Sequence, residues 1–188
     1  VHLKCSMINK MPGFPEDKFA NLKAGYTFMI GHPGKKLLFM GQDFGQYHEW
    51  DESVALDWHL TDEPCNHDLQ KYFSDLLHIY RKYPALYRLD NDWNGFQWIN
   101  ANDGDRSIFS FIRRDETGKK NLLFVINFTP VAREDYRVGV PKKKQYKLIM
   151  NEHGLLEKPE IYKAEEQECD HREYSIGYSL PPYGVAVF

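Results

Sequence analysis

A short polar stretch holds the residues of this sequence that are best suited to bind a hydroxylated ligand. It follows an apolar run, LLFM at residues 37–40, which ends at Gly41. Five residues in the stretch carry amide, carboxylate or indole groups: Gln42, Asp43, Gln46, Glu49 and Trp50. Amides and carboxylates hydrogen-bond hydroxyl groups, and a flat aromatic ring covers the apolar face of a sugar. Together with the rings of Phe44 and Tyr47 and the imidazole of His48, they make this stretch suited to a carbohydrate ligand.

The apolar run is the element that must position these side chains. Four consecutive apolar residues that end abruptly at a glycine are typical of a strand buried on both faces, as in a parallel sheet. A polar loop at the carboxyl end of such a strand is where α/β enzymes build their sites. The alternative is an ordinary surface loop, in which Asp43 and Glu49 only hold the loop together and Trp50 packs beneath it.

Two helices are predicted on either side of this stretch. The first begins at Pro15, with apolar residues at helical spacing behind it, and ends at Gly31. The second covers about residues 66–82, with Asn66 as its cap, and Pro84 stops it. The first forty residues therefore read as helix, turn and strand, which is half of a parallel α/β repeat.

From about residue 93 the pattern changes to short strands. They are rich in Ile, Val, Phe and Tyr, and turn residues separate them, so we predict an antiparallel β-sandwich. The expected strands are 96–99, 107–113, 122–127, 135–140, 146–150, 174–180 and 184–188. The charged segment 157–172 is expected to be a surface excursion. The fold class is therefore α+β, mainly antiparallel, with a boundary between residues 1–89 and 90–188.

Composition excludes several classes of function. The chain has 188 residues and a net charge of -3, which argues against nucleic acid as the main partner. No apolar run approaches the roughly 20 residues of a membrane span. Cys5, Cys65 and Cys169 are widely separated and show no ligand spacing, so we expect reduced thiols, a cytoplasmic protein, and neither metal nor cofactor.

The first half is too small to be a domain of its own. A complete (β/α)8 barrel needs about 250 residues, and one strand with two helices cannot bury both of its faces. We therefore predict the tail end of an α/β domain in residues 1–89, followed by a complete β domain. The two helices must then pack against the β domain or pair with a second copy of the chain.

Seven motifs are spread over the whole chain: KFANL at 18–22, HPGKKLLFMG at 32–41, FGQ at 44–46, EW at 49–50, LDW at 56–58, NFTP at 127–130 and LPP at 180–182. Together they resemble bacterial 1,4-α-glucan branching enzymes of the α-amylase superfamily. The resemblance implies that residues 1–89 end a (β/α)8 catalytic barrel, with residues 37–40 as its last strand. It also implies that residues 90–188 are the amylase-type C-terminal domain.

The resemblance also implies which reaction the protein catalyses. These enzymes cleave an α-1,4 link of a glucan and transfer the segment to a 6-hydroxyl, through a covalent glycosyl-enzyme formed with a pair of carboxylates. A His-Asp-Glu motif with one catalytic carboxylate precedes a Val-His pair in the family, and Val1-His2 is similar to that pair. The resemblance implies that the catalytic carboxylates lie upstream and that this chain contains no catalytic residue.

The same resemblance assigns partners and site residues. The substrate is an α-glucan such as glycogen or amylose, and the upstream catalytic barrel is a partner within the same chain. Gln42, Asp43, Gln46, Glu49 and Trp50 are expected at the rim of the active site. Gln42-Asp43 replaces the Asn-Glu of many relatives.

Two other functions remain open on the residues alone. One is a carbohydrate-binding β-sandwich with a helical extension, and the other is a structural domain that binds nothing. Trp93 and Trp98 are expected in or beside the core of the β domain, with a surface glucan site as the alternative.

Overall fold

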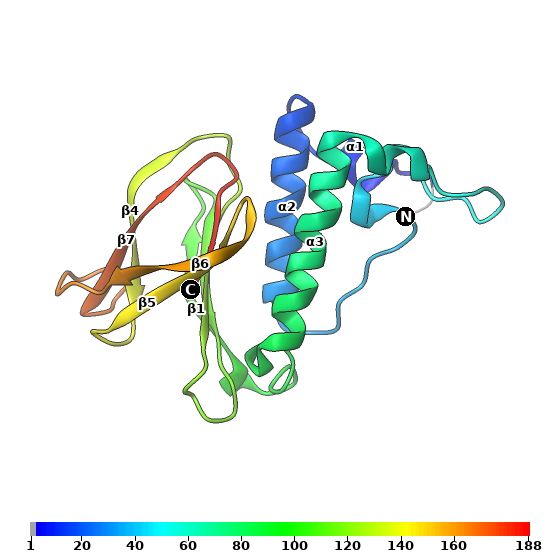
Figure 1. Ribbon diagram of the computed structural model, residues 1–188. Coiled ribbons are helices and arrows are strands. Elements are labelled where there is room, and N and C mark those ends of the chain that lie inside the picture. Colours follow the sequence, from blue (N-terminus) through cyan, green and yellow to red (C-terminus); the bar gives the residue numbers. More distant parts are fainter. Residues whose placement is uncertain (1–2) are drawn as a thin grey trace.

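The computed structural model describes residues 3–188, and the Val1-His2 pair lies outside the described residues. The chain forms three layers (Figure 1). Helices α2 (Pro15–Gly31) and α3 (Pro64–Lys82) lie on one face of a six-stranded antiparallel sheet. A two-stranded sheet covers the opposite face.

The six-stranded sheet is built entirely from the second half of the chain. Its strands follow the order β1-β2-β3-β8-β5-β6, and β4 and β7 form the two-stranded sheet. The bounds are β1 Phe96–Asp103, β2 Ile108–Arg113, β3 Leu122–Asn127, β4 Arg133–Val140, β5 Gln145–Asn151, β6 Gly154–Lys163, β7 Tyr174–Leu180 and β8 Val185–Val187. Every ladder in both sheets is antiparallel.

Short helices fill the connections. Helix α1 covers Met7–Lys10, and four 3-10 helices are η1 Gln42–Phe44, η2 Trp58–Asp62, η3 Pro84–Leu86 and η4 Trp93–Gly95. None of the helices within residues 3–188 is long and apolar enough to cross a membrane.

Strand β3 joins the two hydrophobic cores. All six of its residues are buried, because its side chains alternate between two covered faces. Phe124 and Ile126 belong to the core beneath the helices, whereas Leu123 and Val125 belong to the core between the two sheets. The continuous apolar sequence of this strand follows from burial on both sides.

The C-terminal end of α2 approaches the sheet closely at Gly31. A Cβ atom there would lie 2.9 Å from the rings of Phe111 and Phe124, which stack on each other with centroids 5.0 Å apart. Arg113 of β2 is fully buried and donates hydrogen bonds to the carbonyl of Gly31 at 2.8 Å and to Asp90 Oδ1 at 2.7 Å. One buried guanidinium thus ties the end of the helix to the sheet and to the 87–95 connection.

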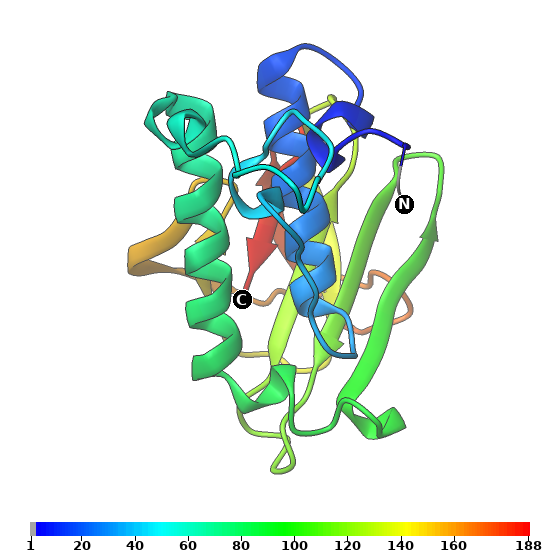
Figure 2. The same cartoon turned by 90° about the vertical axis from the view of Figure 1, so that its right-hand side faces the viewer.

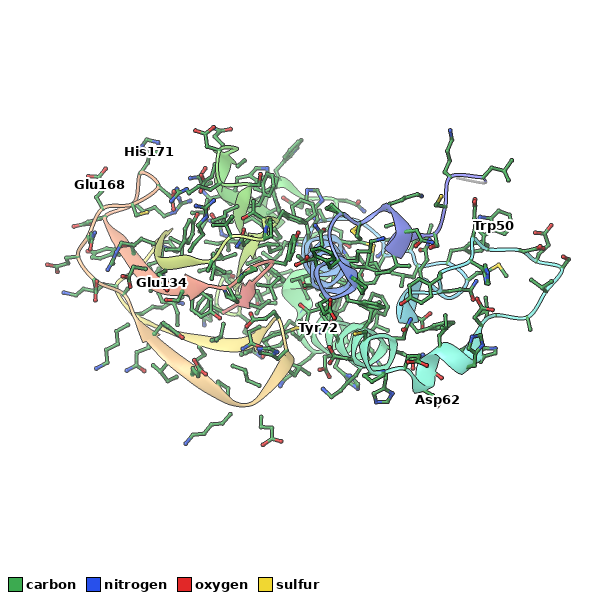
Figure 3. The ribbon with its side chains drawn as sticks, turned by 90° about the horizontal axis from the view of Figure 1, so that it is seen from above. Trp50, Asp62, Tyr72, Glu134, Glu168 and His171 are labelled. Carbon is green, nitrogen blue, oxygen red and sulfur yellow. The ribbon has the colours of Figure 1, made fainter. Side chains whose placement is uncertain are left out.

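The two long helices also hold each other. The hydroxyl groups of Thr27 and Tyr72 are 2.6 Å apart and both residues are buried. Burial raises the pKa of Tyr72 above its usual range. Figure 3 shows Tyr72 in the middle of the molecule, between the sheets on one side and the polar loop on the other.

Most predicted elements are present, with shifted ends. Helix α2 has the predicted bounds, and α3 begins at Pro64, two residues earlier than expected. Asn66 therefore lies inside α3 and is not its cap. The prediction of a surface excursion at 157–172 is wrong in its first part, because β6 continues to Lys163 and pairs with β5.

The predicted strand at residues 37–40 is absent. The segment is irregular, and the exposed fractions of Leu37 and Phe39 are 77% and 47%. The chain passes alongside α2 here without a strand beside it (Figure 2). An apolar run becomes a buried strand only where other strands and helices cover it, and none of the described residues pairs with this segment in a sheet.

Candidate functional site

Two left-handed glycines shape the polar loop. Gly41 has φ 78° and Gly45 has φ 69°, and the single turn of η1 lies between them. Glycine adopts this region without steric cost. A Cβ atom on Gly41 would also lie 2.9 Å from the side chain of Gln46. Both the left-handed backbone and this close contact therefore favour glycine at position 41.

Both long helices anchor this loop. The hydroxyl of Tyr26 in α2 donates to the carbonyl oxygen of Gln42 at 2.6 Å. The side-chain amide of Asn66 in α3 donates to the carbonyls of Phe44 at 2.7 Å and Gly45 at 3.3 Å. Asn66 is 1% exposed. In the sequence, the only signal for this anchor is a polar residue near the start of the predicted helix, and its prediction as a cap is wrong.

Gln42 and Asp43 point to different neighbours. Gln42 Oε1 accepts a hydrogen bond from the backbone N–H of Phe39 at 3.2 Å. Asp43 Oδ2 accepts from the amide of Gln70 in α3 at 3.3 Å. The two side chains therefore diverge from each other although they are adjacent in sequence.

Both polar atoms of the Gln46 side-chain amide form hydrogen bonds within the chain. Its Oε1 accepts from the backbone N–H of Asp57 at 2.9 Å, and its Nε2 donates to the carbonyl of His48 at 3.3 Å. The residue is only 6% exposed. His48 Nδ1 lies 2.7 Å from Asp57 Oδ2, which closes the 46–57 loop a second time.

Glu49 and Trp50 face the N-terminal segment and the exposed apolar run. The carboxylate of Glu49 accepts from the backbone N–H groups of Lys4 at 3.3 Å and Cys5 at 3.1 Å. Trp50 makes an edge-on contact with the ring of Phe39, with centroids 5.4 Å apart. Figure 3 shows Trp50 at the end of the molecule opposite Glu168 and His171.

Four of the five predicted site residues line one small cavity. Gln42, Gln46, Glu49 and Trp50 surround about 30 Å³, while Asp43 is outside this lining. That volume holds about one water molecule, whereas pockets for small ligands have roughly 300–1,000 Å³. Within this chain the cluster is a preformed set of hydrogen-bonding groups at a surface, and it is not an enclosed sugar site.

A larger hollow of about 590 Å³ lies where the end of α2 meets η4 and β1. The side chains of Asp90, Asp92, Trp93 and Trp98 are among its lining residues. Trp98 packs beside the core, with its ring 5.0 Å from Phe96 and 5.6 Å from Phe111.

The prediction that Trp93 lies in or beside the core of the β domain is wrong. Trp93 is 97% exposed and therefore belongs to no core. His32 also lines the hollow, and burial lowers its pKa below the usual value. The hollow thus combines two carboxylates with two indole rings and an imidazole that favours its neutral form.

Metal ligands do not converge in the described part of the chain. Among residues 3–188 there is no group of three or more His, Cys, Asp or Glu side chains that could hold a metal ion.

The sequence is similar over its whole length to known enzymes. It is 53% identical over 194 residues to a protein named 1,4-alpha-glucan branching enzyme GlgB from Butyrivibrio fibrisolvens, a match that covers 100% of this chain and 30% of that protein. It is 44% identical over 194 residues to the protein of the same name from Aquifex aeolicus (strain VF5), covering 98% of this chain and 30% of that protein. The chain thus spans less than a third of the length of these relatives.

Solved structures share the fold at low sequence identity. A pullulanase type I from Bacillus subtilis str. 168 complexed with maltose aligns with a TM-score of 0.69 and 14% identity, covering 93% of this chain and 24% of that chain. An alpha-amylase from H. orenii aligns with a TM-score of 0.57 and 16% identity, covering 92% of this chain and 35% of that chain.

Residues 98–188 match the family described as alpha amylase, C-terminal all-beta domain. Together with the whole-length matches, this means that the chain corresponds to a C-terminal part of the proteins named 1,4-alpha-glucan branching enzyme.

Proposed function

We propose that the longer protein containing this chain is a 1,4-α-glucan branching enzyme. It would cleave an α-1,4-linked glucan such as amylose or glycogen and transfer the segment to a 6-hydroxyl, in the cytoplasm. The catalytic carboxylates would lie in the upstream barrel, and no residue of this chain would be catalytic. The observation that carries the proposal is 53% identity over the whole chain to an enzyme of that name.

The activity test compares the two lengths of protein. The 188-residue chain incubated with amylose is expected to form no new α-1,6 linkages, because a retaining transfer needs a nucleophilic and an acid carboxylate together. The longer protein is expected to form them. New branches made by the pure 188-residue chain would contradict the placement of the catalytic residues upstream, and an inactive longer protein would contradict the reaction itself.

We further propose that the polar loop lies at the rim of the active site. Residues 1–89 would complete the barrel, and residues 90–188 would form the appended β domain. Gln42, Asp43, Gln46, Glu49 and Trp50 would then contact glucan once the upstream barrel extends the small cavity that four of them share. The exposed apolar segment at residues 37–40 supports this proposal, because it would be covered by the neighbouring barrel strands.

Trp50 gives the sharpest test of the rim. We expect Trp50→Ala in the longer protein to lower kcat/KM on amylose about tenfold or more, since an indole supplies a large apolar contact at a sugar face. Trp58→Ala is the matched control, because Trp58 is 57% exposed and contacts Phe44 within the chain. Unchanged kinetics and an unchanged branch-length profile for Trp50→Ala would leave this residue a packing role only.

A second candidate function is glucan binding without catalysis by the β domain. The hollow beside Trp93 and Trp98 favours it, because fully exposed indole next to carboxylates suits a sugar with many hydroxyl groups. Titration of the 188-residue chain with maltoheptaose, read by tryptophan fluorescence, is expected to saturate, and Trp93→Ala is expected to abolish the response. A flat titration of the folded chain would leave a purely structural role.

A further inference from the structure

The edge strand β1 has no helix over it. Within residues 3–188, the core beneath the helices receives buried side chains from β2, β3, β5 and β8, and none from β1. A helix with its side chains is about 10–12 Å wide and neighbouring strands lie about 4.7–4.9 Å apart, so two helices cover about four strands. Figure 2 shows the β1–β2 hairpin extending past α2 on the side away from α3.

Four aromatic side chains form a continuous, partly exposed surface beside α2. The ring centroid of Phe28 in α2 lies 5.9 Å from those of Phe109 in β2 and of Phe128, which follows β3. Trp98 of β1 continues the surface, with its ring 6.2 Å from Phe109 and 6.4 Å from Phe28. None of the four is fully buried, and Trp98 is 37% exposed. We call these four residues the aromatic shelf.

The aromatic shelf lies on the side of α2 that faces away from α3. Helix α2 meets α3 through Tyr26, whose ring lies 5.3 Å from that of Phe73, and through Thr27, which is hydrogen-bonded to Tyr72. Successive side chains of a helix are about 100° apart. Phe28 therefore points about 100° away from Thr27 and about 200° away from Tyr26. The helix–helix contact and the shelf are on different sides of the same helix.

The other edge strand of the sheet, β6, has a different surface. Its exposed Leu155 and Ile161 are separated by the exposed charges of Glu157, Lys158 and Glu160. Single apolar residues among charges are ordinary at a protein surface, whereas a contiguous apolar patch marks an interaction site. The shelf is such a patch, because its four members touch one another and none of them carries a charge.

The surroundings of the shelf extend its apolar character. The ring of His32 lies 5.3 Å from Phe28 and 6.1 Å from Trp98. Burial lowers the pKa of His32 below its usual value, so the imidazole is neutral at pH 7 and above. A group that docks here therefore meets uncharged rings.

We propose that the aromatic shelf is the docking surface for one helix of the upstream barrel, the helix that precedes α2 in the longer protein. This rests on the proposed function, in which residues 1–89 complete a (β/α)8 barrel. The helices of such a barrel form an outer ring, so α2 has a neighbour on each side, and α3 is one of them. The chain spans 30% of the relatives named GlgB, so the remainder of the longer protein can supply the other.

The docking face of this helix has a definite chemistry. It would carry Leu, Ile, Met or aromatic residues at the i, i+3, i+4 spacing of an amphipathic helix. A charged side chain there would be buried against neutral rings without a partner, which is costly. The interface would hold the β domain to the barrel through β1, in addition to the core that α2 and α3 already share with the sheet.

Hydroxyl-radical footprinting of the wild-type proteins, read by mass spectrometry, tests the interface. It compares the oxidation of Trp98 and Phe109 in the 188-residue chain with their oxidation in the longer protein. We expect both side chains to oxidise several-fold more slowly in the longer protein, because a docked helix excludes water from them. Tyr174 of β7 is the control, since it lies in the two-stranded sheet on the opposite side, and we expect equal oxidation in both proteins.

A charge placed on the shelf tests the same contact by its effect on stability. We expect Trp98→Glu to lower the Tm of the longer protein by several degrees more than that of the 188-residue chain. The new carboxylate reaches water in the shorter chain and would be buried beneath the helix in the longer protein. Gln97→Glu is the matched control and should shift both Tm values equally. Gln97 is exposed and pairs with Ile112 of the core between the sheets, so it faces the other way.

Three results of the footprinting would overturn the proposal, and none depends on a variant that folds. Equal oxidation of Trp98 and Phe109 in the two proteins would mean that nothing covers the shelf. Protection that requires added maltoheptaose would assign the shelf to glucan. Protection that is lost when the longer protein is diluted from dimer to monomer would assign it to a second copy.

The branching assay separates this proposal from the proposed function. A longer protein that branches amylose but leaves the shelf unprotected would contradict only the docked helix. A longer protein with a protected shelf but no branching activity would contradict the reaction and leave the interface in place.

Discussion

Side-chain amides hold the polar loop in its shape before any ligand arrives. Gln46 and Asn66 are both buried, and together they make four hydrogen bonds to backbone groups of the 44–57 region. Such residues would position a ligand-binding surface and need not touch the ligand themselves. Glu49 holds the loop to the N-terminal segment, and Gln42 and Trp50 both contact Phe39 of the 37–40 run.

Arg113 is the residue on which the join between the two halves depends most. We expect Arg113→Met to lower the free energy of unfolding by about 3–5 kcal/mol, because it leaves the buried Asp90 carboxylate with only the exposed Lys35 ammonium, 4.0 Å away, as an ionic partner. Arg106→Met is the control, since its ion pair with Asp103 is partly exposed and is expected to contribute less than about 1 kcal/mol. Urea unfolding of both variants measures this. Equal losses would contradict the special role of Arg113.

Lys36 gives a pH-dependent prediction. Burial, with a smaller contribution from Arg113, lowers its pKa from 10.5 to about 8. Between these two values the unfolded chain binds a proton at this side chain that the folded chain has released, so the contribution of Lys36 to stability rises with pH. We expect the wild type to gain Tm relative to Lys36→Met between about pH 7 and about pH 9.5.

The control for this experiment is Lys120→Met, which changes an exposed lysine. Its Tm difference from the wild type is expected to stay constant over the same range. A constant difference for Lys36→Met as well would show that this ammonium is not desolvated in the folded chain.

At the scale of elements, the contact between α2 and the sheet decides how the chain is assembled. The helix buries Phe19, Leu22 and Ile30 in the same core as Phe111 and Phe124 of the sheet. Its amphipathic spacing was visible in the sequence, but the surface that it covers was not. The same face would suit a barrel strand, a second copy of the chain or, as found, the β domain.

Two glycines in α2 test this contact. We expect Gly31→Ala to cost about 1–3 kcal/mol, because the new methyl group would overlap the Phe111 and Phe124 rings. Gly25→Ala, in the same helix with no atom within 4 Å of the new Cβ, is expected to stabilise by up to about 1 kcal/mol. Thermal unfolding compares them. A stabilising Gly31→Ala would mean that the helix end does not approach the sheet as described.

At the scale of the whole molecule, one core joins the two predicted parts. Residues from α2, α3, β2, β3, β5 and β8 belong to a single hydrophobic cluster. The packing is therefore continuous across the predicted boundary between residues 1–89 and 90–188. The polar loop and the connection to α3 extend away from this core (Figure 1).

Limited proteolysis should reflect this arrangement. We expect the first cuts in the exposed segment 51–55, with the two resulting pieces remaining associated, because α2 and α3 share a core with the sheet. Size-exclusion chromatography of the nicked protein, followed by mass spectrometry, measures this. Release of residues 1–86 from an intact β domain would mean that the two parts are independent.

Hydrogen exchange gives a second measure at this scale. The slowest amides are expected in β3, since every residue of this strand is buried and both cores meet on it. The amides of residues 35–40 are expected to exchange fast, because this segment lies outside any sheet. Slow exchange at 35–40 in the monomer would contradict its irregular structure.

Elements whose signal is local can be predicted from the amino-acid sequence alone. Helix α2, most of α3 and seven of the strands follow from the spacing of apolar residues and from Pro and Gly at their ends. The sequence also places the five candidate residues on one loop, of which four line a common cavity. The family followed from motifs along the whole chain.

Features that depend on a partner segment are visible only in the three-dimensional structure. Strand β6 has a mostly exposed surface, so it has no apolar alternation and exists because β5 offers it an edge. Residues 37–40 have a strand-like sequence but no strand beside them. Trp93 is apolar and yet exposed, while Arg113 is charged and yet buried. Local patterns record what a segment could bury, and burial itself requires the other surface to be present.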